Sequence, residues 1–537
     1  MPWFAMKMEP VQPPLLRLPD EILEEIFSEI EEHADLVAFA LASKLCHSIV
    51  APHHTQYRIL RIRHSSPDIW AHLARRSDLA RNLREVHVHE PNSVQVPPDR
   101  IPTTLIDKHL DKELSNADET VRIRNMCKAL SHMQRLRVFV WSCLLPGAQR
   151  PTSHPTHENA VLTAVVNLPT LDQVSLSGKF ALHALEATRD PRGSTYPLWK
   201  LSNLTSLSLH GEAFTKVGNA KHVGRLLSNS PNLEYLKLPM EFTEIQNYNL
   251  PRLKKLSVKM QYGSTNTNLD DSHVRFLENH PSIEDLDWTP IRNPKTPMDL
   301  LPNLRSLRSS TQFAMSLSYP PLEVLPGTPA YGLMTPPSTP VANATPVAAV
   351  PEVTEEQNPL QPQIQRSIEN LDLYGLTPQA LLDLKCIDRL ALRRLKIHSF
   401  GEGEFSALND VAKKFPNIEW ISLPSYYLPR HGPHPLPVSR EQWLDILPRF
   451  TKLQVFRGPG LWYCVKSDKQ SVHEIIMHLV QTNEHLRHLD RVGRHNEVDP
   501  SRQIVISREG EGGKDINYRI ETMLPRKPFD INDRHSS

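Results

Sequence analysis

The sequence predicts an α/β protein: a small all-α N-terminal segment, then an irregular solenoid in which a curved parallel sheet carries outer helices. Three observations predict this fold. Short helical patterns fill the first fifty residues, one apolar phrase returns from residue 80 onward, and helical stretches separate many of these phrases. A Pro/Thr-rich stretch interrupts the series, so the solenoid is expected in two parts.

The N-terminal segment opens with "LLRLPDEILEEIFSEI" at residues 15–30. Apolar residues recur in it at helical spacing, whereas glutamates occupy the other face: Ile22, Leu23, Ile26, Phe27 and Ile30. Two further helical patterns follow, "DLVAFALAS" from residue 35 and "SKLCHSIVAP" from residue 43. Because three such short helices bury little apolar surface, the segment is expected to need a partner or a neighbouring domain.

In order, the Leu-Pro start, the Ile/Phe-rich helix, Asp-Leu and Ser-Lys resemble an F-box. The resemblance covers "LPDEILEEIFSEI…DLVAFALASKLCHSIVAP…YRILRI" and departs from the family at Leu45-Cys46, where a Trp or another large residue is common. It implies docking on the Skp-type adaptor of a cullin–RING ubiquitin ligase. The residues that it implies form or support that surface are Leu18, Pro19, Ile22, Ile26, Leu36, Leu41, Ser43, Leu45 and Ile49. The alternative is a three-helix cap on the domain that follows.

The repeated phrase is an apolar residue, two others, an apolar residue, one other and an apolar residue. Examples are "NLREVHV" at 82, "NLTSLSL" at 203, "NLEYLKL" at 232 and "NIEWISL" at 417. The second and third apolar residues are two apart, so in a strand they face the same side and enter the core. Spacings of roughly 20 to 35 residues between phrases resemble those of leucine-rich repeats.

The array departs from regular leucine-rich repeats because the usual Asn or Cys after the last apolar position is mostly missing; Glu212 stands there after Leu209. Without that side-chain ladder, the solenoid is expected to be irregular. The competing fold, a doubly wound sheet, requires a glycine-rich phosphate turn after a strand, and the sequence contains none.

The segment 326–363 is rich in Pro, Thr and Ala and is expected to be disordered. Within it, "LMTPPST" resembles a phosphothreonine degron, which implies phosphorylation at Thr335 and Thr339; chance Thr-Pro pairs in an unmodified linker are the alternative. Near the C-terminus, two alternating strand patterns flank a Gly-rich turn, typical of a hairpin that closes the solenoid. The expected organisation is a disordered N-terminus at 1–14, an F-box at 15–60, solenoid at 61–325 and 364–495, a hairpin cap at 496–522 and a disordered tail at 523–537.

Composition narrows the function classes. The 537 residues contain 61 Lys plus Arg against 60 Asp plus Glu, which argues against nucleic-acid or membrane binding. Five scattered cysteines without a Cys-x-x-Cys pair favour a reducing compartment, so a cytoplasmic or nuclear protein is expected. The histidine clusters at 53–54, 154–157 and 431–434 lack ligand spacing and are expected to be solvated loops. No metal, cofactor or catalytic motif is predicted, so the chain is not expected to be an enzyme.

Recognition is the remaining function. Residues between the core positions of the strand phrase are expected on the concave face, where lysines and aspartates of neighbouring strands would form adjacent patches of opposite sign. An outward Trp420 would suit an interface anchor. The candidate substrate-binding residues are Tyr235, Lys237, Lys259, Asp285, Asp287, Arg394, Lys396 and Trp420. Together with the F-box resemblance, this implies an adaptor that holds a protein substrate near a ubiquitin-charged enzyme; a leucine-rich-repeat scaffold without a ligase is the alternative.

Overall fold

A computed structural model describes the chain in two compact units, Met1–Thr289 with Leu524–Ser537, and Pro290–Met523. The residues described are 13–30, 33–51, 53–63, 67–89, 100–101, 116–143, 155–178, 180, 196–215, 217–260, 269–292, 294–297, 299–318, 365–401, 403–424, 426–427, 434–435, 438–465, 469–492, 498–509 and 515–522. The expected disordered segments 326–363 and 523–537, most of 1–14, and both Thr335 and Thr339 lie outside them.

The first unit begins with helices and continues as a parallel sheet in chain order, β1-β2-β3-β4-β5-β6-β7-β8. Its strands are β1 Ile59–Arg63, β2 Glu85–His89, β3 Val138–Cys143, β4 Gln173–Gly178, β5 Ser206–His210, β6 Tyr235–Pro239, β7 Lys255–Lys259 and β8 Asp285–Trp288. Its helices are η1 Pro14–Arg17, α1 Asp20–Glu29, α2 His33–Ala42, α3 Lys44–Val50, α4 His53–Gln56, α5 Pro67–Arg75, α6 Ser77–Ala80, α8 Asn116–His132, α9 Pro155–Val166, η2 Pro197–Lys200, η3 Glu212–Phe214, α11 Val217–Ser228, η4 Thr243–Asn247 and α12 Leu269–Glu278.

The second unit repeats this plan and ends in an antiparallel pair. Strands β9-β10-β11-β12-β15-β16 are parallel neighbours; β17 then pairs antiparallel with β16, and β18 pairs antiparallel with β17. The strands are β9 Ser306–Ser310, β10 Asn370–Tyr374, β11 Arg394–Lys396, β12 Trp420–Ser422, β15 Val455–Arg457, β16 His488–Val492, β17 Val498–Glu509 and β18 Asp515–Thr522, with a separate pair β13 Tyr426–Tyr427 and β14 His434–Pro435. The helices are α13 Thr311–Ser316, α14 Pro378–Asp383, η5 Glu404–Ala407, α15 Leu408–Lys414, α16 Arg440–Ile446, η6 Leu447–Arg449, α17 Pro459–Tyr463 and α18 Lys469–Thr482.

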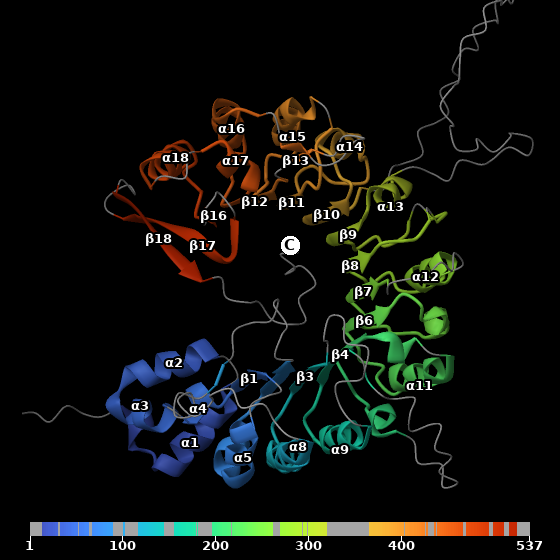
Figure 1. Ribbon diagram of the computed structural model, residues 1–537, viewed down its shortest axis with the longest axis vertical. Helices are drawn as coiled ribbons and strands as arrows, with labels where there is room; N and C mark the ends of the chain where they lie inside the picture. The colour runs from blue at the N-terminus through green and yellow to red at the C-terminus, as the bar shows by residue number, and fades with distance from the viewer. Residues whose placement is uncertain are drawn as a thin grey trace, which may run out of the picture. The chain divides into compact units, whose positions relative to one another are not determined.

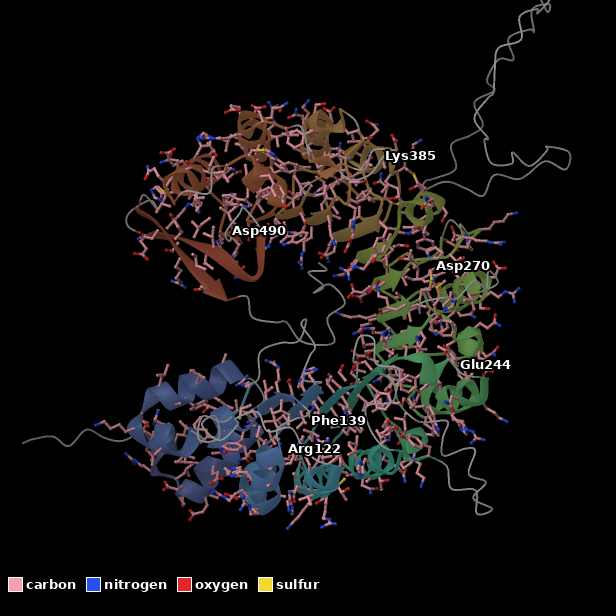
Figure 2. All side chains as sticks on the ribbon, in the orientation of Figure 1. Arg122, Phe139, Glu244, Asp270, Lys385 and Asp490 are labelled. Carbon is pink, nitrogen blue, oxygen red and sulfur yellow. The ribbon has the colours of Figure 1, made fainter. Side chains whose placement is uncertain are left out.

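Within each unit the helices lie on one side of the strands (Figure 1). The apolar residues of the repeated phrase point to that side, as Leu233, Leu236 and Leu238 show, because all three are buried. Phe139, labelled in Figure 2, belongs to this buried layer; its ring lies edge-on to that of Trp141, with the ring centroids 6.4 Å apart. The predicted α/β fold, a leucine-rich-repeat solenoid with outer helices, is therefore confirmed. No helix in the described part of the chain is long and apolar enough to cross a membrane.

A ladder of backbone hydrogen bonds, one residue before most of the parallel strands, joins neighbouring repeats within each unit. The carbonyl of Lys254, for example, accepts the N–H groups of both Glu284 and Asp285 at 2.8 and 2.9 Å. The side chains at these positions often alternate in charge, with ion pairs Arg137–Asp172 at 3.0 Å, Glu234–Lys254 at 3.8 Å, Arg305–Glu369 at 3.8 Å and Arg393–Glu419 at 2.5 Å. Ion pairs thus link the strand starts of neighbouring repeats in a chain that mostly lacks the Asn or Cys found after the strand in regular leucine-rich repeats.

A buried arginine, Arg366, links the segment that begins at residue 365 to the first strand and helix of the second unit. The Arg366 side chain is inaccessible to solvent and donates to the Leu300 carbonyl at 2.8 and 3.1 Å and to the Leu317 carbonyl at 3.1 Å. Its backbone N–H donates to the carbonyl of Cys386 at 2.8 Å. Burial lowers the pKa of Arg366, but a guanidinium remains charged in proteins.

Candidate protein-interaction surfaces

Helices α1, α2 and α3 form a small helical module with its own core. The core residues are Leu23, Phe27, Leu36, Ala40, Cys46 and Val50. Helix α3 begins at an N-cap, because the Ser43 hydroxyl accepts the N–H of Cys46 at 3.0 Å. Of the residues implied by the F-box resemblance, Leu36 therefore supports the module from inside, and Ser43 caps a helix. Ile26, Leu45 and Ile49 are half-buried.

Two groups of exposed apolar side chains, which we together call the module face, lie at the start of α1 and along α2. It consists of Leu18, Ile22, Val37 and Leu41, with exposed fractions of 37%, 49%, 38% and 80%. These are four of the ten large apolar side chains that are exposed among the described residues, and the other six are scattered over the two units. Pro19 is exposed beside Leu18. The adaptor-binding residues implied by the F-box resemblance do not include Val37, although its i, i+4 spacing to Leu41 places both on one side of α2.

Three arginines from the first repeats hold the C-terminal end of α1, and we call them the arginine clamp. Arg58 donates to the carbonyls of Phe27 and Ser28 at 2.7 and 3.1 Å, and Arg84 donates to that of Ser28 at 2.7 Å. Arg135 donates to the Ser28 hydroxyl and forms ion pairs with Glu25 and Glu29 at 2.9 and 3.0 Å. Because the last carbonyls of a helix lack internal partners and carry partial negative charge, cations stabilise this end. The clamp fixes the helical module on β1, β2 and β3.

We call the side of the sheet opposite the buried leucines the strand face. In the first unit, this face does not carry the adjacent patches of opposite charge that the sequence predicts. Asp285 and Asp287 are buried, at 7% and 1% exposure, and Tyr235 is buried as well. Lys255 pairs with Asp285 at 3.1 Å, and Lys259 forms an ion pair with Asp287, which also accepts from the Ser257 hydroxyl. The acidic pair is thus neutralised by one neighbouring strand, β7, and the expectation of a separate negative patch is wrong. Lys237 is half-buried in register with Ser257.

In the second unit, one carboxylate on the strand face collects three basic side chains. Asp372 on β10 accepts from Arg308 at 2.7 and 2.8 Å and from His398 at 2.5 Å, and the Lys396 ammonium lies 3.8 Å away. Burial alone raises the pKa of Asp372, but the hydrogen bond to His398 and the charges of Arg308 and Lys396 bring it to about 2. Burial lowers the pKa of Lys396. The carboxylate is therefore ionised under ordinary conditions.

Beside this cluster, Arg394 lies over the ring of Trp420, with the guanidinium carbon 5.1 Å from the ring centroid. The two residues are direct partners on β11 and β12, and both are half-buried on the strand face. Tyr374, two residues after Asp372, is 51% exposed, and its ring centroid lies 5.3 Å from that of His398. Of the candidate substrate-binding residues, Arg394, Lys396 and Trp420 are thus gathered on one surface, whereas Tyr235, Lys237, Lys259, Asp285 and Asp287 lie in the other unit.

At the far end of the same face, Asp490 on β16 binds Arg457 at 2.9 Å and the backbone N–H of Gly458 at 2.8 Å (Figure 2). Gln503 on β17 accepts from the same guanidinium at 3.1 Å.

The prediction that the histidine clusters lie in solvated loops is partly wrong. His54 lies in α4 and is buried, and His157 lies in α9; His154 and His431 are outside the described residues.

Comparison with known proteins gives structural similarities only. No protein-family model matches the sequence, and no curated protein matches it. Among solved structures, the complex of Rad7 and Elc1 from yeast aligns over 90% of this chain and 91% of the other chain, with 12% identity and a TM-score of 0.38. The TLR13–ssRNA13 complex aligns over 71% of this chain and 40% of the other, with 13% identity and a TM-score of 0.25. Function is therefore inferred from the chain's own residues.

Proposed function

We propose that this protein is the substrate-recognition adaptor of a Skp–cullin–F-box type ubiquitin ligase. The helical module docks on the Skp-type adaptor, and through it on a cullin–RING ligase, while the solenoid holds a protein substrate. The chain acts as a non-catalytic subunit in the cytoplasm, the nucleus or both, and needs no cofactor. Its effect is proximity, because a held substrate presents its lysines at high effective concentration.

The observation that carries the proposal is the module face. Four large apolar side chains are exposed on a segment of little more than twenty residues, at the Leu-Pro start and along α2. Exposed large apolar side chains that are this frequent in one short segment are typical of a region that a partner covers. Leu18, Pro19, Ile22 and Leu41 are also residues that the F-box resemblance implies for adaptor binding. The F-box resemblance is the reason for proposing a Skp-type adaptor as the partner. The exposed apolar side chains are the reason for proposing these residues as its contacts.

The arginine clamp supports a role in positioning. A module joined by a flexible linker would let the adaptor swing relative to the repeats, whereas Arg58, Arg84 and Arg135 fix α1 on the first three strands. A fixed attachment keeps the adaptor at a constant distance from these repeats. That geometry suits proximity-driven transfer because effective concentration depends on reach and stiffness.

Co-purification with a Skp-type adaptor tests the proposal, comparing the native chain with Leu18→Ala/Ile22→Ala and Leu41→Ala variants. A matched control is Leu390→Ala, which removes a leucine of the second unit whose exposure, 56%, lies between those of Leu18 and Leu41. Native chain and control are expected to bind with equal stoichiometry. Each truncation at the module face should weaken binding by about 1–2 kcal/mol, because interface anchors typically contribute this much. Circular dichroism must show unchanged folding.

The second candidate is a leucine-rich-repeat scaffold that binds proteins without a ligase. The paired charges and the Trp420 surface on the strand face of the second unit are equally suited to it. If a folded native chain fails to bind any Skp-type adaptor, the ligase proposal is refuted and the scaffold stands.

A further inference from the structure

The sheet of the second unit ends in a long, regular edge strand, β18. Strands β17 and β18 continue the sheet beyond β16 (Figure 1), and among the described residues β18 pairs with β17 alone. All eight residues of β18 match β17 without a register shift, and none of them is a proline. Bulges and prolines are common protections of sheet edges, so β18 lacks two of them. The terminal hairpin therefore extends the sheet and presents a row of outward backbone groups that no described strand pairs with.

On the helix side of the hairpin, the apolar core ends at Ile520. Ile504 and Ile506 of β17 are buried, and their partners on β18 are Ile520 and Tyr518. The Tyr518 hydroxyl is hydrogen-bonded to Nδ1 of His473 on α18 at 2.9 Å, so the last helix reaches this far. Ile520 stands on the same side, because alternate residues of a strand share a face, yet it is 52% exposed. A large apolar side chain is thus left at the edge of the sheet.

On the strand face of the hairpin, Arg519 and Glu521 flank Ile520 with opposite charges. Both are exposed, and they form an ion pair at 2.5 Å within the strand. This order is self-complementary. If two antiparallel copies of β18 meet with Ile520 opposite Ile520, then Arg519 of each copy lies opposite Glu521 of the other, which is attractive. The neighbouring symmetric registers are centred on Arg519 or Glu521 and place like charges opposite each other.

We propose that β18 binds a second copy of this chain by antiparallel pairing about a two-fold axis at Ile520. The segment Tyr518–Thr522 of each copy would form the paired strands, and the two Ile520 side chains would cover each other. A contact of this symmetry closes on itself, so it gives dimers rather than fibres. Because the contact is one strand wide, the association is expected to be reversible, with a dissociation constant of about 1–100 µM. This inference goes beyond the adaptor role and does not depend on it.

Sedimentation velocity of the full-length chain tests the inference at concentrations across about 1–100 µM. The native chain should shift from monomer to dimer over this range. Ile520→Asp should weaken dimerisation at least about tenfold, because two carboxylates would then face each other across the axis. Leu390→Asp is the matched control, since it adds the same charge at a leucine of similar exposure, 56%, in the same unit. This control and Leu18→Ala/Ile22→Ala should dimerise like the native chain, the latter because the module face is not involved.

Charge reversal tests the register. Arg519→Glu and Glu521→Arg should each weaken dimerisation at least about tenfold, because all facing charges then have the same sign. An equimolar mixture of these two variants should dimerise again, because each chain then faces the opposite charge in the other. Loss of the ion pair within one strand would not be restored by mixing. Circular dichroism must show unchanged folding for every variant.

Three results would overturn the inference. A native chain that stays monomeric at the highest concentration would leave the edge to a strand of a different protein. Dimerisation that Ile520→Asp does not weaken would assign the contact to another surface. A mixture of the two charge variants that stays monomeric would refute the register. Ile520→Asp should still co-purify with a Skp-type adaptor wherever the native chain does, so this inference and the adaptor proposal fail independently.

Discussion

Replacing Arg366 with methionine is expected to loosen the second unit near its first strand. The side chain is buried and is the donor to the carbonyls of Leu300 and Leu317. Methionine fills similar space but donates nothing, so two buried carbonyl groups lose a partner. At about 1–3 kcal/mol for each orphaned group, the cost is roughly 2–6 kcal/mol. Relief of the buried charge offsets part of this, which leaves a destabilisation of about 3 kcal/mol.

Hydrogen exchange measured by mass spectrometry checks this value without requiring the two units to unfold together. Amides of β9 and β10 in Arg366→Met should exchange about a hundredfold faster than in the native chain, the equivalent of about 3 kcal/mol. Arg389→Met, which changes an exposed arginine of the same unit, is the control and should leave exchange unchanged. A change of less than about fivefold, or under about 1 kcal/mol, would refute the reasoning that these carbonyls depend on the guanidinium.

Two further predictions concern stability. Because the folded-state pKa of Asp372 is about 2, below its ordinary value, its ion pairs stabilise the fold above about pH 4, and that contribution of about 2 kcal/mol disappears as the pH falls toward 2. Asp372→Asn should therefore lower the urea stability of the second unit at pH 6 and have little effect at pH 2.5; an equal loss at both would contradict the assignment. Gly211→Ala should destabilise the first unit by about 1–3 kcal/mol, because Gly211 has a φ of +137° and an added Cβ would lie 2.1 Å from the Gly178 carbonyl oxygen. Thermal melting against Gly375→Ala, where an added Cβ meets nothing within 4 Å, separates the clash from the positive φ.

The strands were predictable from the sequence because their apolar residues alternate. Leu236 and Leu238 lie two apart and both reach the core, and the same spacing recurs through both units. The arginine clamp was not predictable. Ser28 and Arg135 are 107 positions apart, and an arginine before a strand does not indicate which helix end it will meet. Such contacts depend on how the repeats stack, which the local pattern does not contain.

The candidate surfaces show the same division. The F-box resemblance placed Ile22 on the adaptor-binding surface, but only the packing of α2 shows that Leu36 is in the core and Leu41 outside it. Alternation likewise placed Asp287 on the strand face, without indicating that Lys259 of the preceding strand would neutralise it. The contacts between side chains depend on the register of two paired strands. The number of residues between paired strands varies from repeat to repeat, so the sequence pattern alone does not give that register.

The alternating charges at the strand starts restrict how this chain can gain or lose repeats. In the second unit the series begins Arg305, Glu369, Arg393, Glu419. Deletion of the Glu369 repeat alone would bring Arg305 next to Arg393, two like charges in adjacent positions. Deletion of the Glu369 and Arg393 repeats together would instead bring Arg305 next to Glu419 and keep attraction. Where the alternation holds, length changes in steps of two repeats are therefore favoured over steps of one.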